Sequence, residues 1–486
     1  MVNTANPGPI DASTEAELAS LGVAGAAEAI RNGDLTAEAY ATALLQRARL
    51  HGDLNAFVTI DEAAGVLAAA RQADAARAAG AASPLLGVPL GIKDSYLTKG
   101  IPTSLGIKPL AGFVPQEDAE AVRAVKEAGA LVFGKNNLVE MSFGLTGHNA
   151  PYGQVRNPVD RDRVSGGSSS GSAAAVAAGL VPASLGGDTI GSIRVPASLC
   201  GVVGFKPTTG RWPRGGAAPV SHTLDTTGVL ARSVEDCALM DAVVTGAAPT
   251  QFDAREAGLT GVRLAYAPRQ FLDLVEPDVD ARFREALTWL SDVGAEIVEM
   301  DLGEDFGALS QSATWSIFFH ETVGAVSGFL LEHGVPITFE GVIESLKPEL
   351  QGAWRYMVLP DGGGATSVDT YQTALAVKRT EAQRRLNAIF SDHGAQALLQ
   401  PTTPATAPRI DQQTKFMIRE REVSDLVLAN NTLVASLCGL PGISMPAGLS
   451  QAGLPIGLEL DGPSYGDRAL LDLARRVETV LARQLA

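Results

Sequence analysis

Two glycine-rich segments hold the serine side chains that are best suited to chemistry in this chain. The first reads GGSSSGS at residues 166–172 and contains Ser168, and the second reads DTIGSIRVP at residues 188–196 and contains Ser192. Glycine lets backbone N–H groups approach a substrate closely, and a serine beside such groups can act as a nucleophile with an oxyanion hole. A flexible glycine–serine linker would have a similar composition, but helix-like and strand-like sequence follows these segments. The pattern therefore predicts a site of nucleophilic catalysis.

A serine nucleophile needs a base, and the sequence offers histidines and lysines. The six histidines stand in no recognisable triad pattern. Lys93 follows the apolar run at residues 86–92, which is typical of a strand buried on both faces. Burial disfavours the ammonium form and lowers the pKa of a lysine. Lys93 is therefore a candidate for a neutral general base, although its spacing from the serines does not by itself show that the groups meet.

These candidates lie in a chain that alternates helix-like and strand-like segments. Residues 261–300 predict a strand–helix–strand unit, whereas residues 304–375 show little periodicity and contain several aromatic side chains. Such alternation predicts an α/β fold. From alanine-rich or amphipathic runs and from apolar runs, we expect helices at residues 24–31, 36–49, 61–79, 118–128 and 171–179, and strands at residues 86–92, 130–133 and 195–205.

Composition argues against several classes of protein. The formal net charge of the 486-residue chain is −16 and its basic residues form no cluster, which argues against nucleic-acid binding. The first residues lack the basic start and apolar core of a signal peptide, and no stretch reaches the roughly 20 apolar residues that a membrane span needs. Three cysteines in apolar or helical segments suit a reducing compartment. We therefore expect a cytoplasmic protein, and without metal-ligand or nucleotide-binding motifs we expect no cofactor and no metal.

Several motifs in the same order resemble those of the amidase signature family. The two serine segments carry the strongest likeness, and GVPLGIKD around Lys93 belongs to it. Two stretches, MSFGLTGHNAPYGQVRNP and ASLCGVVGFKPTTGRWP, are most similar to the indoleacetamide and mandelamide hydrolases of that family. Further matching segments are GKNNLVEMSFG at residues 134–144, CGVVGFKPT at 200–208, SHTLDTTGVLARSVEDC at 221–237, GLPGISMPAG at 439–448 and PIGLELDGP at 455–463.

The resemblance implies a single amidase signature domain over residues 1–486, built as one large mixed β-sheet surrounded by α-helices. Residues 1–80 would supply N-terminal helices, residues 81–245 the catalytic core segment, and residues 300–375 a variable region that helps to shape the substrate pocket. The expected partner is a small-molecule amide, ester or carbamate, and a homodimer is left open.

The resemblance also implies roles for individual residues. Lys93 would be the general base, Ser168 the bridging serine after a cis Gly167–Ser168 bond, and Ser192 the nucleophile that forms an acyl-enzyme. Because a β-branched residue tolerates positive φ poorly, we expect negative φ at Ile190, where many members have glycine, with the Ile190 side chain narrowing the pocket. The oxyanion hole would consist of the N–H groups of Thr189, Ile190, Gly191 and Ser192, with Ser169, Asp188 and Arg194 in support.

These residues predict a serine amidohydrolase that cleaves carboxylic amides, with aryl-bearing amides or anilides favoured and esters or carbamates (urethanes) left open. One alternative is the A subunit of a tRNA-dependent amidotransferase, which resembles the same family, although the acidic balance argues against RNA contact. A second is an α/β-hydrolase-type esterase, because residues 167–171 fit G-x-S-x-G with Ser169 as nucleophile. The polar segment before Ser169 does not read as the strand that this elbow requires. A catalytically inactive binding protein ranks last, because all three triad positions are filled.

Overall fold

A large mixed β-sheet forms the centre of the computed structural model, which describes residues 11–60, 63–248 and 258–485. Its strands are β1 (Phe57–Ile60), β2 (Pro89–Lys93), β3 (Leu131–Asn136), β4 (Ala183–Asp188), β5 (Val203–Lys206), β6 (Thr226–Ala231), β7 (Arg263–Tyr266), β8 (Glu296–Glu299), β9 (Ala397–Pro401), β12 (Gly442–Leu449) and β13 (Pro455–Asp461). Their order across this 11-stranded sheet is β1-β3-β2-β4-β6-β5-β12-β13-β9-β7-β8. β2 runs parallel to β3 and β4, β7 runs parallel to β8 and β9, and the other neighbours are antiparallel. The predicted α/β fold with a large mixed sheet is therefore confirmed.

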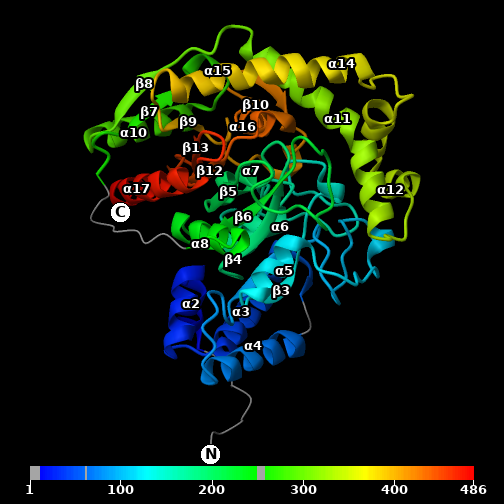
Figure 1. The fold of residues 1–486 in the computed structure, drawn as a ribbon, viewed down its shortest axis with the longest axis vertical. Coiled ribbons are helices and arrows are strands. Elements are labelled where there is room, and N and C mark those ends of the chain that lie inside the picture. The colour runs from blue at the N-terminus through cyan, green and yellow to red at the C-terminus, as the bar shows by residue number, and fades with distance from the viewer. Residues whose placement is uncertain (1–10, 61–62, 249–257, 486) are drawn as a thin grey trace, which may run out of the picture.

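Helices surround this sheet. They are α1 (Ala12–Ser20), α2 (Val23–Asn32), α3 (Ala37–Leu50), α4 (Ala63–Ala78), α5 (Glu120–Glu127), α6 (Ser170–Ala177), α7 (Arg194–Cys200), α8 (Val234–Thr245), α9 (Pro268–Phe271), α10 (Pro277–Asp292), α11 (Phe306–Glu332), α12 (Phe339–Ser345), α13 (Pro348–Ala353), α14 (Val368–Thr373), α15 (Thr380–Ser391), α16 (Leu433–Cys438) and α17 (Asp467–Leu485). Figure 1 shows α2, α3 and α4 at the lower end of the molecule, whereas α11, α12, α14 and α15 form an arch over the opposite side. A separate two-stranded sheet pairs β10 (Lys415–Ile418) with β11 (Arg421–Ser424). Within the described ranges, every helix is too short or too polar to cross a lipid bilayer.

The parallel pair β2 and β4 brings the catalytic candidates to one edge of the sheet. Gly91 of β2 lies opposite Ser184 of β4, and β2 is buried along its whole length. The carboxyl ends of parallel strands lie at the same edge, where open α/β sheets bind their ligands. Lys93 at the end of β2 and Asp188 at the end of β4 therefore emerge at neighbouring positions.

Most predicted helices form close to their expected ends. Gly33 ends α2 in a left-handed conformation with φ of 83°. Thr36 begins α3, and its Oγ1 accepts the N–H of Ala39 at 3.1 Å. The predicted strand–helix–strand unit is also confirmed, because β7 and β8 pair in parallel around α10. The helix expected at residues 61–79 is present as α4 from Ala63, and residues 61–62 lie outside the described residues.

The expectation of one strand over residues 195–205 is wrong for its first half. The chain forms the buried helix α7 there, which Gly201 ends with φ of 72°, and a strand begins only at Val203. Pro196 stands in the first turn of α7, where its missing N–H would have no helical partner in any case. Because α7 is buried on all sides, its sequence is apolar all round, and periodicity cannot then distinguish a helix from a buried strand.

The region without clear periodicity, residues 304–375, is largely helical. Its main element is the 27-residue helix α11. Apolar side chains of α11 serve two purposes, since some pack into the core and others line cavities beside the catalytic candidates. An amphipathic pattern is lost when a helix is apolar on more than its core-facing side.

Candidate active site

Lys93 is fully embedded at the end of β2 and contacts the first serine segment. Lys93 is only 1% exposed, and its Nζ lies 2.8 Å from Ser168 Oγ. Burial lowers the pKa of Lys93 to about 7, and the nearby carboxylates of Asp188 and Asp225 offset only part of this effect. A large fraction of this lysine is therefore a neutral amine near pH 7, which is the form that can accept a proton.

The serine segment before α6 packs against the helix that follows Ser192. The peptide bond Gly167–Ser168 is cis, as expected. Gly166 has φ of 80°, and a Cβ there would lie 2.6 Å from Pro196 Cα in α7, so only glycine fits this approach. The Ser169 N–H then donates to Ser192 O at 3.2 Å. These contacts place the two serine segments side by side.

The loop that contains Ser192 is built around the carboxylate of Asp188. Asp188 Oδ1 accepts the Gly191 N–H at 2.7 Å, and its Oδ2 accepts the Ile193 N–H at 3.1 Å. Arg194 binds the same carboxylate through Nε and Nη2, both at 3.0 Å, and Glu459 through Nη1 at 2.6 Å. Burial opposes ionisation of Asp188, but the charge and hydrogen bonds of Arg194 hold the pKa of this carboxyl below its ordinary value. Asp188 and Arg194 thus shape the loop from beneath.

One expected oxyanion donor must be corrected. The Gly191 N–H is taken by Asp188 Oδ1, so it cannot also serve an oxyanion. None of the hydrogen bonds in the described part of the chain uses the N–H groups of Thr189, Ile190 or Ser192. These three remain available, whereas Gly191 acts as a structural position with φ of 140°.

Ile190 stands between that loop and a cavity. It is not among the described non-glycine residues with positive φ, so the expected negative φ is confirmed. The Ile190 carbonyl accepts a hydrogen bond from Thr432 Oγ1 at 2.6 Å, which fixes this peptide unit. The Ile190 side chain is buried and lines the larger of two cavities at the site.

Ser169 supports the fold of the site and is not placed as a free nucleophile. Its Oγ donates to Gly187 O at 3.1 Å and accepts the Gly187 N–H at 3.2 Å, at the end of β4. Between β3 and α6 the described chain contains no strand that would lead into an α/β-hydrolase elbow. The geometry therefore argues against the alternative with Ser169 as nucleophile.

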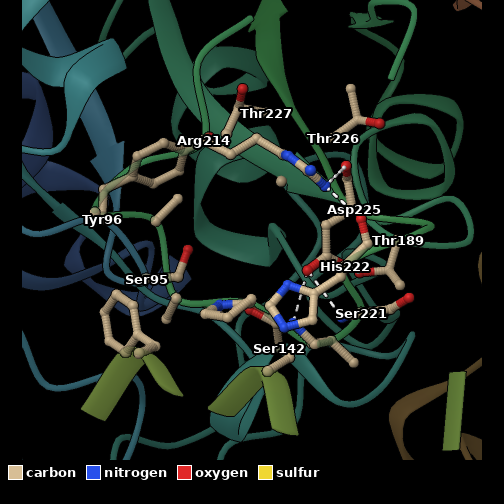
Figure 2. Close-up of a pocket in the computed structure, with 18 of the residues that line it drawn as sticks. Ser95, Tyr96, Ser142, Thr189, Arg214, Ser221, His222, Asp225, Thr226 and Thr227 are labelled. Atoms are coloured by element: carbon tan, nitrogen blue, oxygen red, sulfur yellow. Dashed lines mark hydrogen bonds between the residues drawn. The ribbon is translucent and has the colours of Figure 1, made fainter. Parts of the chain in front are cut away.

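Two cavities flank the serine segments, and we call them the lysine cavity and the aromatic cavity. The lysine cavity has a volume of about 260 Å³ and is lined by Lys93 and Ser168 (Figure 2). Figure 2 shows Ser95 and Tyr96 at one side of it and Thr189, Ser221 and Asp225 at the other. The aromatic cavity has a volume of about 500 Å³, and its lining includes Ser192, Ile190, Phe143, Trp315, Phe318 and Phe319.

Aromatic contacts make the wall of the aromatic cavity continuous. The rings of Trp315 and Phe319 stack with centroids 5.5 Å apart, and Phe143 meets Phe318 edge-on at 4.8 Å. Trp354 is buried against Phe143 at 5.1 Å and serves the core, whereas Tyr356 is exposed. Sequence alone could not separate these roles, because they depend on which face of each helix points to the cavity.

The sequence analysis missed a chain of hydrogen bonds that ties α11 to the oxyanion loop. Glu321 of α11 accepts hydrogen bonds from the Ser221 hydroxyl, from the Thr223 N–H at 2.9 Å and from Thr223 Oγ1 at 2.5 Å. Asp225 accepts the Ser221 N–H at 2.9 Å and Thr189 Oγ1 at 2.7 Å. Asp225 lies in the segment SHTLDTTGVLARSVEDC, whose likeness to the family was the one sequence feature that pointed to this part of the site. The contact of Asp225 with Thr189 and the contacts of Ser221 and Thr223 with Glu321 join segments that are far apart in sequence, so they cannot be read from the motif.

Histidines and metals do not offer another centre in the described ranges. His222 and His333 line the lysine cavity and His148 lines the aromatic cavity, yet none has a hydrogen bond to Ser168 or Ser192. No group of three or more His, Cys, Asp or Glu side chains in the described part of the chain is arranged to hold a metal ion.

Comparison with known proteins agrees with this geometry. The Amidase family model matches residues 39–471. The chain belongs to the amidase signature family. It is 36% identical over 468 residues to the mandelamide hydrolase of Pseudomonas putida, covering 93% of this chain and 90% of that protein, which confirms the expected likeness to that group. It is 38% identical over 477 residues to the A subunit of the glutamyl-tRNA(Gln) amidotransferase of Roseiflexus castenholzii, covering 93% of this chain and 94% of that protein.

The fold comparison leads to the same family. A crystal structure of an amidase superposes with a TM-score of 0.82 at 31% identity and covers 96% of this chain and 100% of that one. Family membership and the named amide hydrolases among the relatives make this chain an amide-cleaving hydrolase.

Proposed function

We propose that this chain hydrolyses carboxylic amides whose acyl group carries an aromatic ring, through an acyl-enzyme on Ser192. The observation that carries the proposal is the contact of 2.8 Å between Lys93 Nζ and Ser168 Oγ, with a buried lysine whose pKa is about 7. A neutral amine next to a hydroxyl can draw a proton through it from a second hydroxyl, which is the activation that a serine nucleophile requires.

In the proposed first half-reaction, Ser168 takes the proton of Ser192 Oγ and passes its own to Lys93 Nζ. Ser192 Oγ attacks the carbonyl carbon, and the N–H groups of Ile190 and Ser192 stabilise the oxyanion, with that of Thr189 close by. Lys93 then returns the proton through Ser168 to the amide nitrogen, the C–N bond breaks and the amine leaves. The acyl group stays on Ser192 as an ester.

In the second half-reaction a water molecule replaces the amine. Ser168 takes a proton from this water and passes its own to Lys93, and the water oxygen attacks the ester carbon. Lys93 then returns the proton through Ser168 to Ser192 Oγ, the ester bond breaks and Ser192 leaves as its alcohol. The acid product and the free enzyme result, and no cofactor is needed.

The aromatic cavity supports the choice of acyl group. Ser192 lies in its lining together with the rings of Phe143, Trp315, Phe318 and Phe319. Aromatic walls hold aromatic ligands by offset or edge-on ring contacts, and apolar burial adds to the affinity. Esters and carbamates with the same acyl side use the same acyl-enzyme chemistry, and we include them among the proposed substrates.

The amidotransferase reading stays as the second candidate, because the Roseiflexus castenholzii protein matches at 38% identity. Glutamine has no aromatic ring and would gain little from the aromatic cavity. Glutaminase assays on the purified chain, and a search for co-purifying proteins, separate this candidate from the first.

The direct test is a panel of aryl amides, anilides, aryl carbamates and aryl esters with the purified chain. We expect turnover of aryl-acyl amides that falls at least about 10³-fold in Ser192→Ala, in Ser168→Ala and in Lys93→Met. Ser169→Ala is the matched control, since its hydroxyl binds Gly187 only, and it should retain measurable activity. Loss of activity in Ser169→Ala with full activity in Ser192→Ala would refute the proposal.

We also propose a single domain and a cytoplasmic location, with no nucleic-acid partner. In support, one sheet joins strands from both halves of the chain, from β1 near residue 57 to β13 near residue 461, and the three described cysteines are buried free thiols. The net charge of −16 argues against binding of nucleic acid. Size-exclusion chromatography with light scattering decides between a monomer and the homodimer that the sequence leaves open.

A further inference from the structure

The two cavities meet the catalytic candidates from different sides. Lys93 and Ser168 line the lysine cavity and not the aromatic cavity, whereas Ile190 and Ser192 line the aromatic cavity and not the lysine cavity. Among the described residues, only Ser142 and Thr189 line both cavities. A substrate bound across this junction therefore has one half beside the nucleophile and the other half beside the proton relay.

The chemistry decides which half of an amide lies on which side. The proton that releases the amine comes from Ser168 and Lys93, so the amide nitrogen must point toward them when the C–N bond breaks. The acyl group stays attached to Ser192 and remains beside Ile190 and the aromatic cavity. The substituent on nitrogen then extends into the lysine cavity.

The lysine cavity is much larger than the site that an ammonia leaving group would need. A cavity of about 150 Å³ accommodates benzene, and a water molecule occupies about 30 Å³ of the liquid. The lysine cavity has a volume of about 260 Å³, and the rings of Tyr96 and Phe329 are part of its wall. It therefore has room for a substituted aromatic ring.

The same cavity reaches the surface, which gives the amine a way out. Lys93 and Ser168 are buried at its inner end, whereas His222, Gly328 and Glu332 are exposed residues of its lining.

We propose that the lysine cavity binds the aromatic N-substituent of the leaving amine, so that the preferred substrates are N-aryl amides, which release an aniline, and not primary amides, which release ammonia. This inference rests on the proposed function. Atoms balance as in any amide hydrolysis, with the proton of Ser192 transferred to the nitrogen and water supplying the carboxylate oxygen.

Two glycines of α11 offer a matched pair of variants. Gly328 lines the lysine cavity, and a Cβ added there meets no atom within 4 Å. Gly324 is exposed one turn earlier on the same helix, has the same open surroundings and lies outside both cavities. Leucine at either position raises helix propensity to a similar degree, and only the leucine at position 328 adds bulk to the lining of the lysine cavity.

The test compares phenylacetamide with N-phenylacetyl aniline, which share one acyl group. We expect the wild-type chain to have at least a tenfold higher kcat/KM for the anilide. Gly328→Leu should lower kcat/KM for the anilide about tenfold and change that for the primary amide less than twofold, and Gly324→Leu should change neither. Thermal melting shows that both variants fold.

A second measurement uses aniline itself. Added aniline should inhibit hydrolysis of phenylacetamide in a saturable way in the wild-type chain, and Gly328→Leu should weaken this inhibition. Equal losses for both substrates in Gly328→Leu, or a wild-type chain that cleaves only the primary amide, would overturn this inference and leave the proposed function standing. A wild-type chain that cleaves neither substrate nor any other of the panel would overturn the proposed function and this inference with it.

Discussion

The protonation of Lys93 should set the pH dependence of the reaction. Burial lowers the pKa of Lys93 from 10.5 to about 7, which corresponds to about 5 kcal/mol in favour of the neutral amine. If only the neutral amine starts the proton relay, about one enzyme molecule in ten is active at pH 6 and about nine in ten at pH 8. We therefore expect kcat/KM to rise nearly tenfold between these pH values with a midpoint near pH 7.

A pair of substitutions separates the charge of Asp225 from its hydrogen bond to Thr189. The Asp225 carboxylate raises the pKa of Lys93, so Asp225→Asn should move the midpoint to lower pH. Thr189→Val removes the 2.7 Å hydrogen bond to Asp225 and keeps the charge, so it should lower kcat with the midpoint unchanged. His222→Gln is the control for the histidine that lines the same cavity, and it should leave the midpoint in place.

The assay is kcat/KM for one neutral aryl amide from pH 5 to pH 10, in buffers of constant ionic strength. A rate that stays flat from pH 6 to pH 8 and rises only near pH 10 would mean that Lys93 keeps its ordinary pKa. That result would refute the reasoning from burial. A midpoint that moves with His222 and not with Asp225 would assign the proton transfer to the histidine instead.

Three further predictions follow from the same contacts. Lys93→Met should be inactive, but its free energy of unfolding at pH 7 should exceed that of the wild-type chain by up to about 4 kcal/mol. The pKa of Lys93 is lower in the folded state than in the unfolded state, so the wild-type chain gains stability as the pH rises from 7 to 10.5. The difference in Tm between the two chains should therefore shrink toward pH 10. Arg194→Met leaves Asp188 buried without its cation and should lower the free energy of unfolding, measured in urea, by about 3–5 kcal/mol. Arg384→Met breaks only the exposed pair with Glu381 and should change this free energy little. Similar losses in the two variants would show that Arg194 does not hold the loop in place. Trp315→Ala should lower kcat/KM for aryl-acyl amides about tenfold, since an aromatic ring gains about 1.5–3 kcal/mol on burial. The kcat/KM for acetyl amides should stay nearly unchanged. Tyr356→Ala, at an exposed position, should change kcat/KM for neither kind of substrate.

The features of the site that could be predicted from the sequence depend on residues that are close together along the chain. The apolar run before Lys93 indicated a buried lysine, and the glycines around Ser168 and Ser192 indicated close backbone approach. That these three groups meet came only from the resemblance to a family, because the segments are far apart along the chain. The structure shows that Lys93 contacts Ser168, and it places the two serine segments side by side, since β2 and β4 are parallel neighbours and the Ser169 N–H binds Ser192 O.

The failures have the same physical origin. Gly191 was expected to face an oxyanion, but its N–H turns to Asp188 three residues earlier, a choice that depends on where Arg194 holds the carboxylate. The strand expected at residues 195–205 is partly the helix α7, because an apolar segment buried on every side carries no periodicity. Glu321 could not be recognised from sequence, since its partners Ser221 and Thr223 lie in a distant segment.

The single helix α11 carries walls of both cavities at different heights. Trp315, Phe318 and Phe319 belong to the aromatic cavity, whereas Ala325, Gly328 and Phe329 belong to the lysine cavity two to three turns later. In the proposed substrate orientation, mutations in the earlier turns would change the preferred acid and mutations in the later turns the preferred amine. Acyl specificity and amine specificity would then evolve separately although both depend on α11. Two libraries of variants, one for the turns before residue 322 and one for the turns after it, would test each specificity by itself.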